Sequence, residues 1–181
     1  MPTILSHPAV PLALGFVLGR ATVSTRLLAV GAACAMLPDA DVAGLALGVP
    51  YGSPWGHRGA THSLAFALAI GALGALAARW LQARAAVAFG FLATATASHG
   101  ALDALTDGGS GIAFLWPAST QRFASPWQPI EVSPIGLSAL ASDYFADVLR
   151  SELVWIWLPA LAVAAAGHGV RRARRLTPGT R

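Results

Sequence analysis

The sequence contains no lysine and few charged residues of any kind. All twelve basic residues are arginines, and charged residues make up only 11% of the 181 residues, against roughly 25% in an ordinary soluble domain. Hydrophobic residues make up 55%, and the mean hydropathy is +0.60. A soluble protein needs polar residues to cover its surface, and this chain has too few. The composition therefore favours an integral membrane protein over an apolar soluble helical bundle.

Cysteine is nearly absent as well. The single Cys34 excludes an intramolecular disulfide and any zinc site built from several cysteines. It lies in an apolar run, where we interpret it as a small core residue. The sequence also lacks a Gly-x-Ser-x-Gly elbow, a phosphate-binding loop and a dinucleotide-binding glycine fingerprint, which argues against serine hydrolase chemistry and against nucleotide binding.

The formal net charge of +4 does not predict a nucleic-acid partner. Much of the positive charge lies in one C-terminal cluster, made of Arg171, Arg172, Arg174 and Arg175. A basic cluster directly after an apolar segment is typical of a cytoplasmic anchor at a membrane surface. We therefore expect the lipid bilayer, and no nucleic acid, as the surroundings of this protein.

Apolar segments predict an all-α fold, a polytopic membrane bundle of about four to five helices. The segments are residues 4–18, 27–37, 63–81, 85–105 and 153–167. Because a helix needs about 20 residues to cross the hydrocarbon core, the third and fourth segments are good spanning candidates. The second is short for a span, since it ends at a break formed by Pro38 and Asp39.

Residues 106–150 differ from the apolar segments. They are rich in glycine, proline and aromatic residues, including Trp116 and Trp127, and aromatic rings favour the headgroup zone of a membrane. We predict an extramembrane or interfacial loop here. The whole of residues 1–175 is expected to form a single integral membrane domain, followed by a disordered tail over residues 176–181.

Polar residues recur at the ends of the apolar segments. If the N-terminus lies outside and the chain crosses at each segment, the C-terminal arginines and most others lie inside, as the positive-inside rule requires. The same alternation brings one set of polar residues to the outer side. We predict that this set forms a metal site at the outer face of the membrane, with a cytoplasmic C-terminus; its members are His7, Asp39, Asp41, His57, His62, His99 and Asp103.

The residue types of this set suit a metal ion. His99 and Asp103 are four apart in a predicted helix and so share one face; a simple hydrogen bond between them is the alternative. Asp39 and Asp41 either belong to an ordinary turn, or their carboxylates act as metal ligands or as a general base. Histidine and aspartate without cysteine suit zinc, manganese or iron(II), and zinc is the default for hydrolysis, because a bound cation lowers the pKa of its water.

The stretch from His57 to Ser63 combines several polar side chains before an apolar run. His57 and His62 flank Gly59, which predicts a loop leading into a helix, and Thr61 or Ser63 is expected to cap that helix. Arg58 is either an interface anchor or a binding group for an anionic substrate. Asp41, Arg58 and Asp103 are therefore the candidate catalytic residues. His7 is the least secure ligand, and His168 is expected on the opposite side.

Together these motifs resemble the YdjM-like family of bacterial inner-membrane proteins, which are described as metal-dependent hydrolases and as LexA-binding. The likeness rests on four motifs within residues 5–110, namely His7-Pro8, Leu37 to Asp41, His57 to Ser63, and Ser98-His99 through Thr106. The family is in turn distantly similar to the zinc-dependent phospholipase C and P1 nuclease group. That second resemblance implies phosphoester hydrolysis with the histidines and aspartates above as zinc ligands.

We therefore expect a membrane-bound metal-dependent hydrolase of phosphoesters on a lipid or lipid-linked substrate, using a metal-activated water. The resemblance implies the bacterial inner membrane, so the outer face that carries the site is expected to be the periplasmic face. Two alternatives stay open. A metal-ion transporter or sensor would use the same residues but would need polar groups continuing across the membrane. A non-catalytic membrane protein that binds a protein partner would use the polar motifs only to stabilise its bundle.

Overall fold

The computed structural model describes residues 1–134 and 144–176, with side chains up to residue 173. Within these ranges the chain is helical and has no strand, only two isolated bridges in the loop after residue 105. The helices are α1 (Ala9–Leu18), α2 (Thr25–Met36), α3 (Val42–Ala46), α4 (Leu64–Leu76), α5 (Ala85–Ala104), α6 (Tyr144–Glu152) and α7 (Leu158–Leu176). Shorter elements join them: the 3-10 turns η1 (Leu37–Asp41) and η2 (Ala60–His62), and a π-helical turn η4 (Leu153–Trp157).

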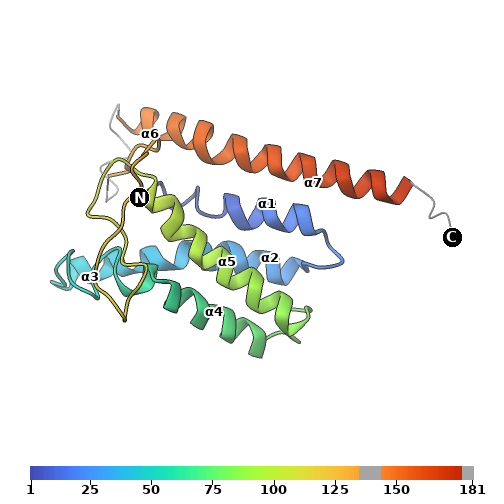
Figure 1. Ribbon diagram of the computed structural model, residues 1–181, viewed down its shortest axis with the longest axis horizontal. Coiled ribbons are helices and arrows are strands. Elements are labelled where there is room, and N and C mark those ends of the chain that lie inside the picture. The colour runs from blue at the N-terminus through green and yellow to red at the C-terminus, as the bar shows by residue number, and fades with distance from the viewer. Residues whose placement is uncertain (135–143, 177–181) are drawn as a thin grey trace.

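Five apolar helices lie side by side in an up-and-down bundle (Figure 1). Helix α5 packs on α4 and on α2, while α1 packs on α7. Glycines allow these close contacts: a Cβ at Gly31 of α2 would meet the ring of Phe91 at 2.4 Å, and one at Gly71 of α4 would meet Phe89 O at 2.9 Å. Small residues at helix contacts are typical of membrane bundles, where backbones approach closely.

Three continuous helical stretches are long and apolar enough to cross a membrane, which agrees with the predicted all-α membrane bundle. They are Thr25–Ala46, Ala85–Ala104 and Tyr144–Ala173. The apolar helices α1 and α4 are shorter. The last stretch is the least covered by protein, with only 6% of its most apolar window buried, so most of its surface is left for lipid.

The α-helix of the second segment ends at Met36, close to the predicted break at Pro38, but the chain continues as a 3-10 turn instead of leaving the helical path. Pro38 lies in the first turn of η1, where its missing N–H has no helical acceptor to lose. The chain therefore stays helical from Thr25 to Ala46, a stretch of 22 residues, and the second segment is long enough to span.

Two other segment bounds also differ from the prediction. Helix α4 ends at Leu76 rather than near residue 81, because the chain reverses through a turn in which Gln82 has φ 53° and Ala83 N–H donates to Ala78 O. The last helix begins at Tyr144, inside the predicted loop, and runs well past residue 167. The rest of the predicted tail, residues 177–181, lies outside the described residues, as do residues 135–143 of the predicted loop.

Candidate metal centre

The bundle brings all the predicted site residues together at one end. His7 lies directly before α1, and η1 contains Asp39 and Asp41. His57 lies before η2 and His62 lies at its end, while the last turns of α5 carry His99 and Asp103. Because neighbouring helices run in opposite directions, these positions all fall at the same end of the molecule (Figure 1). His168, as expected, is elsewhere: it lines a cavity at the far end of α1 and α7.

An inner ring of four buried side chains has the donor atoms for one metal ion. One donor atom each of Asp39, His62, His99 and Asp103 lies within 4.8 Å of the others. His99 Nε2 is 3.1 Å from His62 Nε2 and 3.3 Å from Asp39 Oδ1. His62 Nε2 is 3.5 Å from Asp103 Oδ2. Two imidazoles and two carboxylates converge on one small volume.

The carboxylates of this ring have no ordinary partners. All four oxygens of Asp39 and Asp103 are buried without a hydrogen bond among the described residues. Asp103 is completely buried and Asp39 is 6% exposed. Buried polar groups are nearly always hydrogen-bonded, and a buried carboxylate without compensation is very costly. Four such oxygens that face imidazole nitrogens fit a bound cation, so the residues present suit the metal that the sequence predicts.

His7 faces the same two carboxylates from their other side. Its Nε2 is 3.6 Å from Asp39 Oδ2 and 3.7 Å from Asp103 Oδ1, whereas the second oxygen of each carboxylate faces the His62 and His99 pair. The His7 ring stacks on the His99 ring at 3.7 Å. Burial, and then the neighbouring His99, lower the pKa of His7 to about 3, so its imidazole is neutral at pH 7 and has a lone pair for a cation.

Hydrogen bonds fix which nitrogen of His99 faces the ring. His99 Nδ1 lies 2.7 Å from the carbonyl oxygen of Ala35, and a carbonyl can only accept, so Nδ1 carries the proton. The lone pair of His99 is therefore on Nε2, which points at His62. A backbone carbonyl that fixes the tautomer of a histidine in this way is the usual support for a metal ligand.

His62 connects the inner ring to a second group of residues. Its Nδ1 is 3.2 Å from Asp41 Oδ2. Burial lowers the pKa of His62, but the neighbouring carboxylates of Asp103 and Asp41 outweigh burial and raise the pKa to about 9. In the metal-free protein His62 therefore holds a proton on each nitrogen at pH 7 and donates Nε2–H to His99. A metal ion at the inner ring has to replace that proton.

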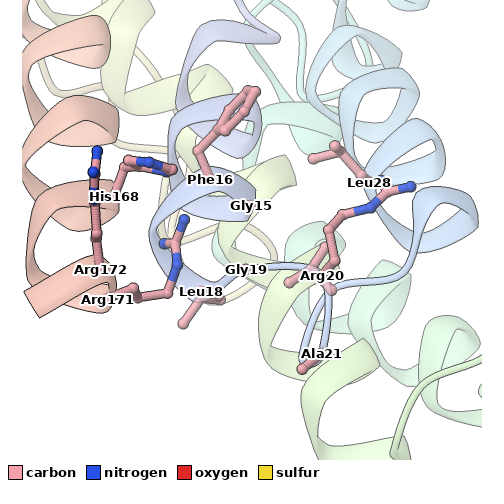
Figure 2. Close-up of a pocket in the computed structure, with 11 residues that line it drawn as sticks. Gly15, Phe16, Leu18, Gly19, Arg20, Ala21, Leu28, His168, Arg171 and Arg172 are labelled. Carbon is pink, nitrogen blue, oxygen red and sulfur yellow. The ribbon is translucent and has the colours of Figure 1, made fainter. Parts of the chain in front are cut away.

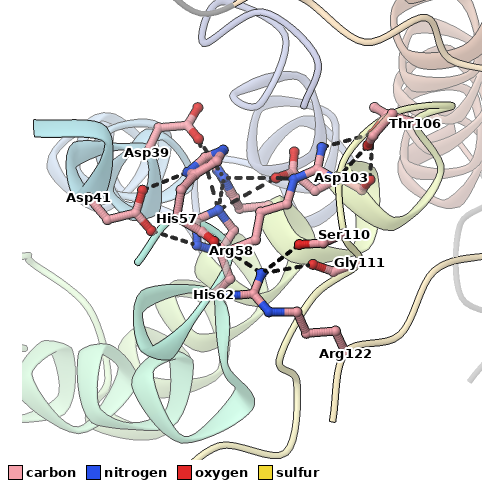
Figure 3. Close-up of polar contacts among 12 residues, drawn as sticks. Asp39, Asp41, His57, Arg58, His62, Asp103, Thr106, Ser110, Gly111 and Arg122 are labelled. Atoms are coloured by element: carbon pink, nitrogen blue, oxygen red, sulfur yellow. Dashed lines mark hydrogen bonds and ion pairs between the residues drawn. The ribbon is translucent and has the colours of Figure 1, made fainter. Parts of the chain in front are cut away.

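The second group consists of Asp41, His57 and Thr61 around His62 Nδ1. His57 Nδ1 is 2.7 Å from Asp41 Oδ1, and the Thr61 hydroxyl donates to Asp41 Oδ2 at 2.7 Å. Asp41, His57 and His62 also have donor atoms within 4.8 Å of one another, which leaves a second ion possible. Both oxygens of Asp41 are already hydrogen-bonded, however, so this geometry suits a group that orients His62. Figure 3 shows Asp41 facing His57 and His62.

Arg58 is buried against the inner ring and is not an interface anchor. Its side chain is 2% exposed, and its Nε is 3.4 Å from Asp103 Oδ2. The other nitrogens donate to Gly108 O at 2.7 Å and Thr106 Oγ1 at 2.9 Å (Figure 3). Both terminal nitrogens of Arg58 are thus hydrogen-bonded to the protein. Its backbone has φ 64°, a conformation that side chains larger than glycine rarely adopt and that often marks functional sites.

Two supporting residues were not predicted. Arg122 crosses from the loop and donates to the carbonyl oxygens of Tyr51, Ser53 and His57, which holds the turn before η2 in place. Glu152 of α6 is 2% exposed and accepts hydrogen bonds from the hydroxyls of Thr3 at 2.7 Å and Ser6 at 2.6 Å, so it anchors the turn that carries His7. Neither contact has a local sequence signal, because the partners are far apart along the chain.

The capping prediction at the start of α4 is confirmed for Ser63 only. The Ser63 hydroxyl accepts from Phe66 N–H at 3.1 Å, whereas the Thr61 hydroxyl is used by Asp41. This cap begins α4 immediately after His62, which fixes that histidine at the mouth of the bundle.

Comparison with known proteins identifies the family. The YdjM inner membrane protein family matches residues 1–174. The chain belongs to this family. It is also 46% identical over 162 residues to the inner membrane protein YbcI of Escherichia coli (strain K12), a match that covers 89% of this chain and 94% of YbcI. Family membership and the three candidate spans together make this chain an inner membrane protein, as the resemblance implied.

No solved structure matches the chain. The more distant similarity to zinc-dependent phospholipase C and P1 nuclease is not shown by these comparisons and stays a prediction.

Proposed function

We propose that this protein is a membrane-bound metal-dependent hydrolase that acts on phosphoesters of a lipid or lipid-linked substrate. The observation that carries the proposal is the inner ring, where the four carboxylate oxygens of Asp39 and Asp103 are buried without hydrogen-bond partners among the described residues. These oxygens lie near the imidazole nitrogens of His7, His62 and His99. A divalent cation bound among these carboxylates and imidazoles would compensate the buried negative charge.

Asp39, His62, His99 and Asp103 would hold the ion, with His7 as a fifth donor. Zinc is the first expectation for this donor set, and manganese or iron(II) is also compatible. When bound, such an ion acts as a Lewis acid and lowers the pKa of water. Catalysis needs a position for that water, so fewer donors than the full set are expected to bind a catalytic zinc at one time.

The chain's own residues would orient and balance this site. Asp41 holds the His62 ring through Nδ1, and Arg58 offsets part of the negative charge of Asp103. Trp55, Leu47 and Trp127, which are largely exposed, lie in or near the loops around this end of the bundle. Exposed aromatic and aliphatic residues of this kind favour the headgroup zone, which supports a substrate that belongs to the membrane.

Transport of metal ions is less well supported. Beyond the site, the bundle contains an apolar cluster that includes Leu27, Leu81, Phe91 and Leu92. A transported cation needs polar groups along its path, and this cluster supplies none.

Burial of the donors favours a second candidate function. His7, His99 and Asp103 have no exposed surface, and His57 and His62 are at most 3% exposed. A fully enclosed ion could serve as a structural link between four elements in a protein that binds a partner. Closed donor sets are typical of structural zinc sites.

One experiment separates these functions. The protein is purified in mild detergent, and its metal content is measured beside a His62→Ala/His99→Ala variant and a His168→Ala control. About one or more ions per wild-type and control chain, lost from the double variant, are expected. Metal-dependent release of phosphate from lipid phosphoesters would then support the hydrolase. Metal without turnover on any phosphoester would favour the structural function, and no metal in the wild type would reject both.

A further inference from the structure

A cavity of about 640 Å³ lies at the end of the bundle opposite the metal centre, between the ends of α1 and α7 and the start of α2. We call it the arginine cavity, because Arg20, Arg171 and Arg172 line it (Figure 2). Its volume falls within the range of about 300–1,000 Å³ that is typical of small-molecule sites. Nothing in the proposed hydrolase chemistry uses it.

The cavity is positively charged on one side and apolar on the other. His168 lies beside the arginines, and none of the described residues that line the cavity is acidic. Phe16, Leu18 and Leu28 supply an apolar wall, and the first two remain 59% and 39% exposed. An amphipathic ligand, with an anionic group at one end and an apolar part at the other, matches both sides.

Hydrogen bonds hold two of the three arginines, Arg171 and Arg20, in position. Arg171 donates to the carbonyl oxygen of Val17, and its Nε lies 3.2 Å from where a Cβ on Gly19 would be. Gly19 has φ 78°, and its lack of a side chain leaves space for Arg171 at the end of α1. Arg20 donates to the Thr25 hydroxyl. Guanidinium groups held in this way suit the oxygens of a phosphate.

The surroundings identify the source of such a ligand. Only 6% of the most apolar window of the stretch Tyr144–Ala173, which contains α7, is buried, so the cavity opens beside a helix that faces lipid. Basic pockets between membrane helices bind anionic headgroups, because lipid phosphates lie at the same depth as the ends of the helices. A free phosphate ion would gain nothing from the apolar wall.

We propose that the arginine cavity binds an anionic phospholipid, with the headgroup phosphate against Arg20, Arg171 and Arg172 and the start of an acyl chain along Phe16 and Leu28. This site is separate from the metal centre and does not depend on the proposed hydrolase activity. Its ligand is a resident lipid that stabilises the contact of α1 with α7.

The test compares lipid retention by the full chain in detergent, measured by native mass spectrometry. Phosphatidylglycerol and phosphatidylcholine with the same acyl chains are added in equal amounts. We expect the wild type to retain phosphatidylglycerol selectively. Arg20→Gln/Arg172→Gln should weaken this retention roughly 25-fold, since each arginine near a membrane surface contributes about fivefold. Arg79→Gln/Arg84→Gln removes the same charge at the same end of the bundle but outside the arginine cavity, and it should retain the lipid.

A second variant guards against misfolding. Ala21 is exposed and lines the cavity, so Ala21→Glu leaves the fold and the arginines intact while opposing an anionic ligand, and it should also lose the lipid. Equal retention of both lipids by the wild type, or equal losses in the control, would overturn the proposal. Displacement of the lipid by millimolar inorganic phosphate would show that the cavity is a site for phosphate ions. A dimer that covers the cavity would show that it is a contact between two copies of the chain. Either result would overturn the proposal of a bound lipid.

Discussion

At the scale of single residues, the proposed metal centre, called the metal centre below, depends on which protons its histidines carry. His99 is fixed with its lone pair inward by Ala35 O, and His62 is held as a doubly protonated cation between Asp41 and the inner ring. In the metal-free protein, one proton on His62 therefore takes the place that a metal ion would fill.

Metal binding should release about one proton per ion at pH 7.5, because His62 has a pKa of about 9 without metal and must lose its Nε2 proton to become a ligand. His7, with a pKa of about 3, has none to release. The number is obtained from calorimetric titrations with Zn²⁺ in buffers of different ionisation enthalpy. Release should fade as the pH rises above about 9; release of no proton at pH 7.5 would contradict this account.

The raised pKa of His62 also predicts how the stability of the metal-free protein changes with pH. The pKa of His62 in the folded protein lies above its usual value of 6.5. Below pH 6.5 the charged imidazole therefore contributes its full stabilisation to the metal-free fold, and this contribution is lost as the pH rises through about 9. A metal-bound protein should lack this loss, since the ion replaces the proton.

A substitution at Asp41 tests whether this carboxylate orients the His62 ring. We expect Asp41→Asn to lower metal affinity by roughly 10- to 100-fold without removing a donor of the inner ring, which is the usual effect of changing a group that orients a ligand. Affinity is measured by competition with a chelating dye. Asp147→Asn, a change of the same chemistry at an exposed position, is the matched control. A complete loss of one bound ion would instead make Asp41 a ligand.

At the scale of elements, the loop after α5 closes over the metal centre through Arg58. A Cβ at Gly109 would lie 2.2 Å from Arg58 Nη1, and Gly109 has φ 94°. Gly109→Ala should therefore push Arg58 away from Asp103 and weaken metal binding about as much as Arg58→Gln does. Gly52→Ala, where a Cβ meets nothing within 4 Å, should leave metal binding unchanged. Circular dichroism and metal content of the three variants provide the comparison.

The arrangement of the elements could be predicted from the sequence better than their bounds. The convergence of His7, Asp39, His62 and His99 was predictable, because helices that alternate in direction place alternate segment ends at the same side. Helix bounds were less predictable. Pro38 marks the end of a helix in most contexts, yet here it begins a 3-10 turn that continues α2.

Long-range supports were not predictable at all. Glu152 gives no sign in the sequence that it holds Thr3 and Ser6, because these partners lie 149 and 146 residues away. Arg122 likewise bonds to carbonyl groups, and every residue has one of these. Such contacts depend on how the backbone folds rather than on residue type.

At the scale of the whole molecule, the metal centre and the arginine cavity lie at opposite ends of the bundle. The side of the membrane on which each lies stays a prediction from the arginine distribution. In a Cys34→Ala background, Thr120→Cys should react with a membrane-impermeant maleimide added to intact spheroplasts, because Thr120 is exposed and lies two residues before Arg122, which donates to His57 O. Gly169→Cys, which is exposed near the arginine cavity, should react only after permeabilisation. The reverse pattern would invert the assigned topology.

The short helices carry a consequence for the surrounding lipid. Helix α4 has 13 residues and is therefore about 20 Å long, and Leu68, Leu73 and Leu76 on its surface are more than half exposed. The hydrocarbon layer of a typical bilayer is about 30 Å thick. Local thinning of the bilayer is one way in which such a hydrophobic mismatch is relieved. Thinning beside α4 would bring lipid headgroups closer to the metal centre, so acyl-chain length should then set how readily a phosphoester at the membrane surface reaches it.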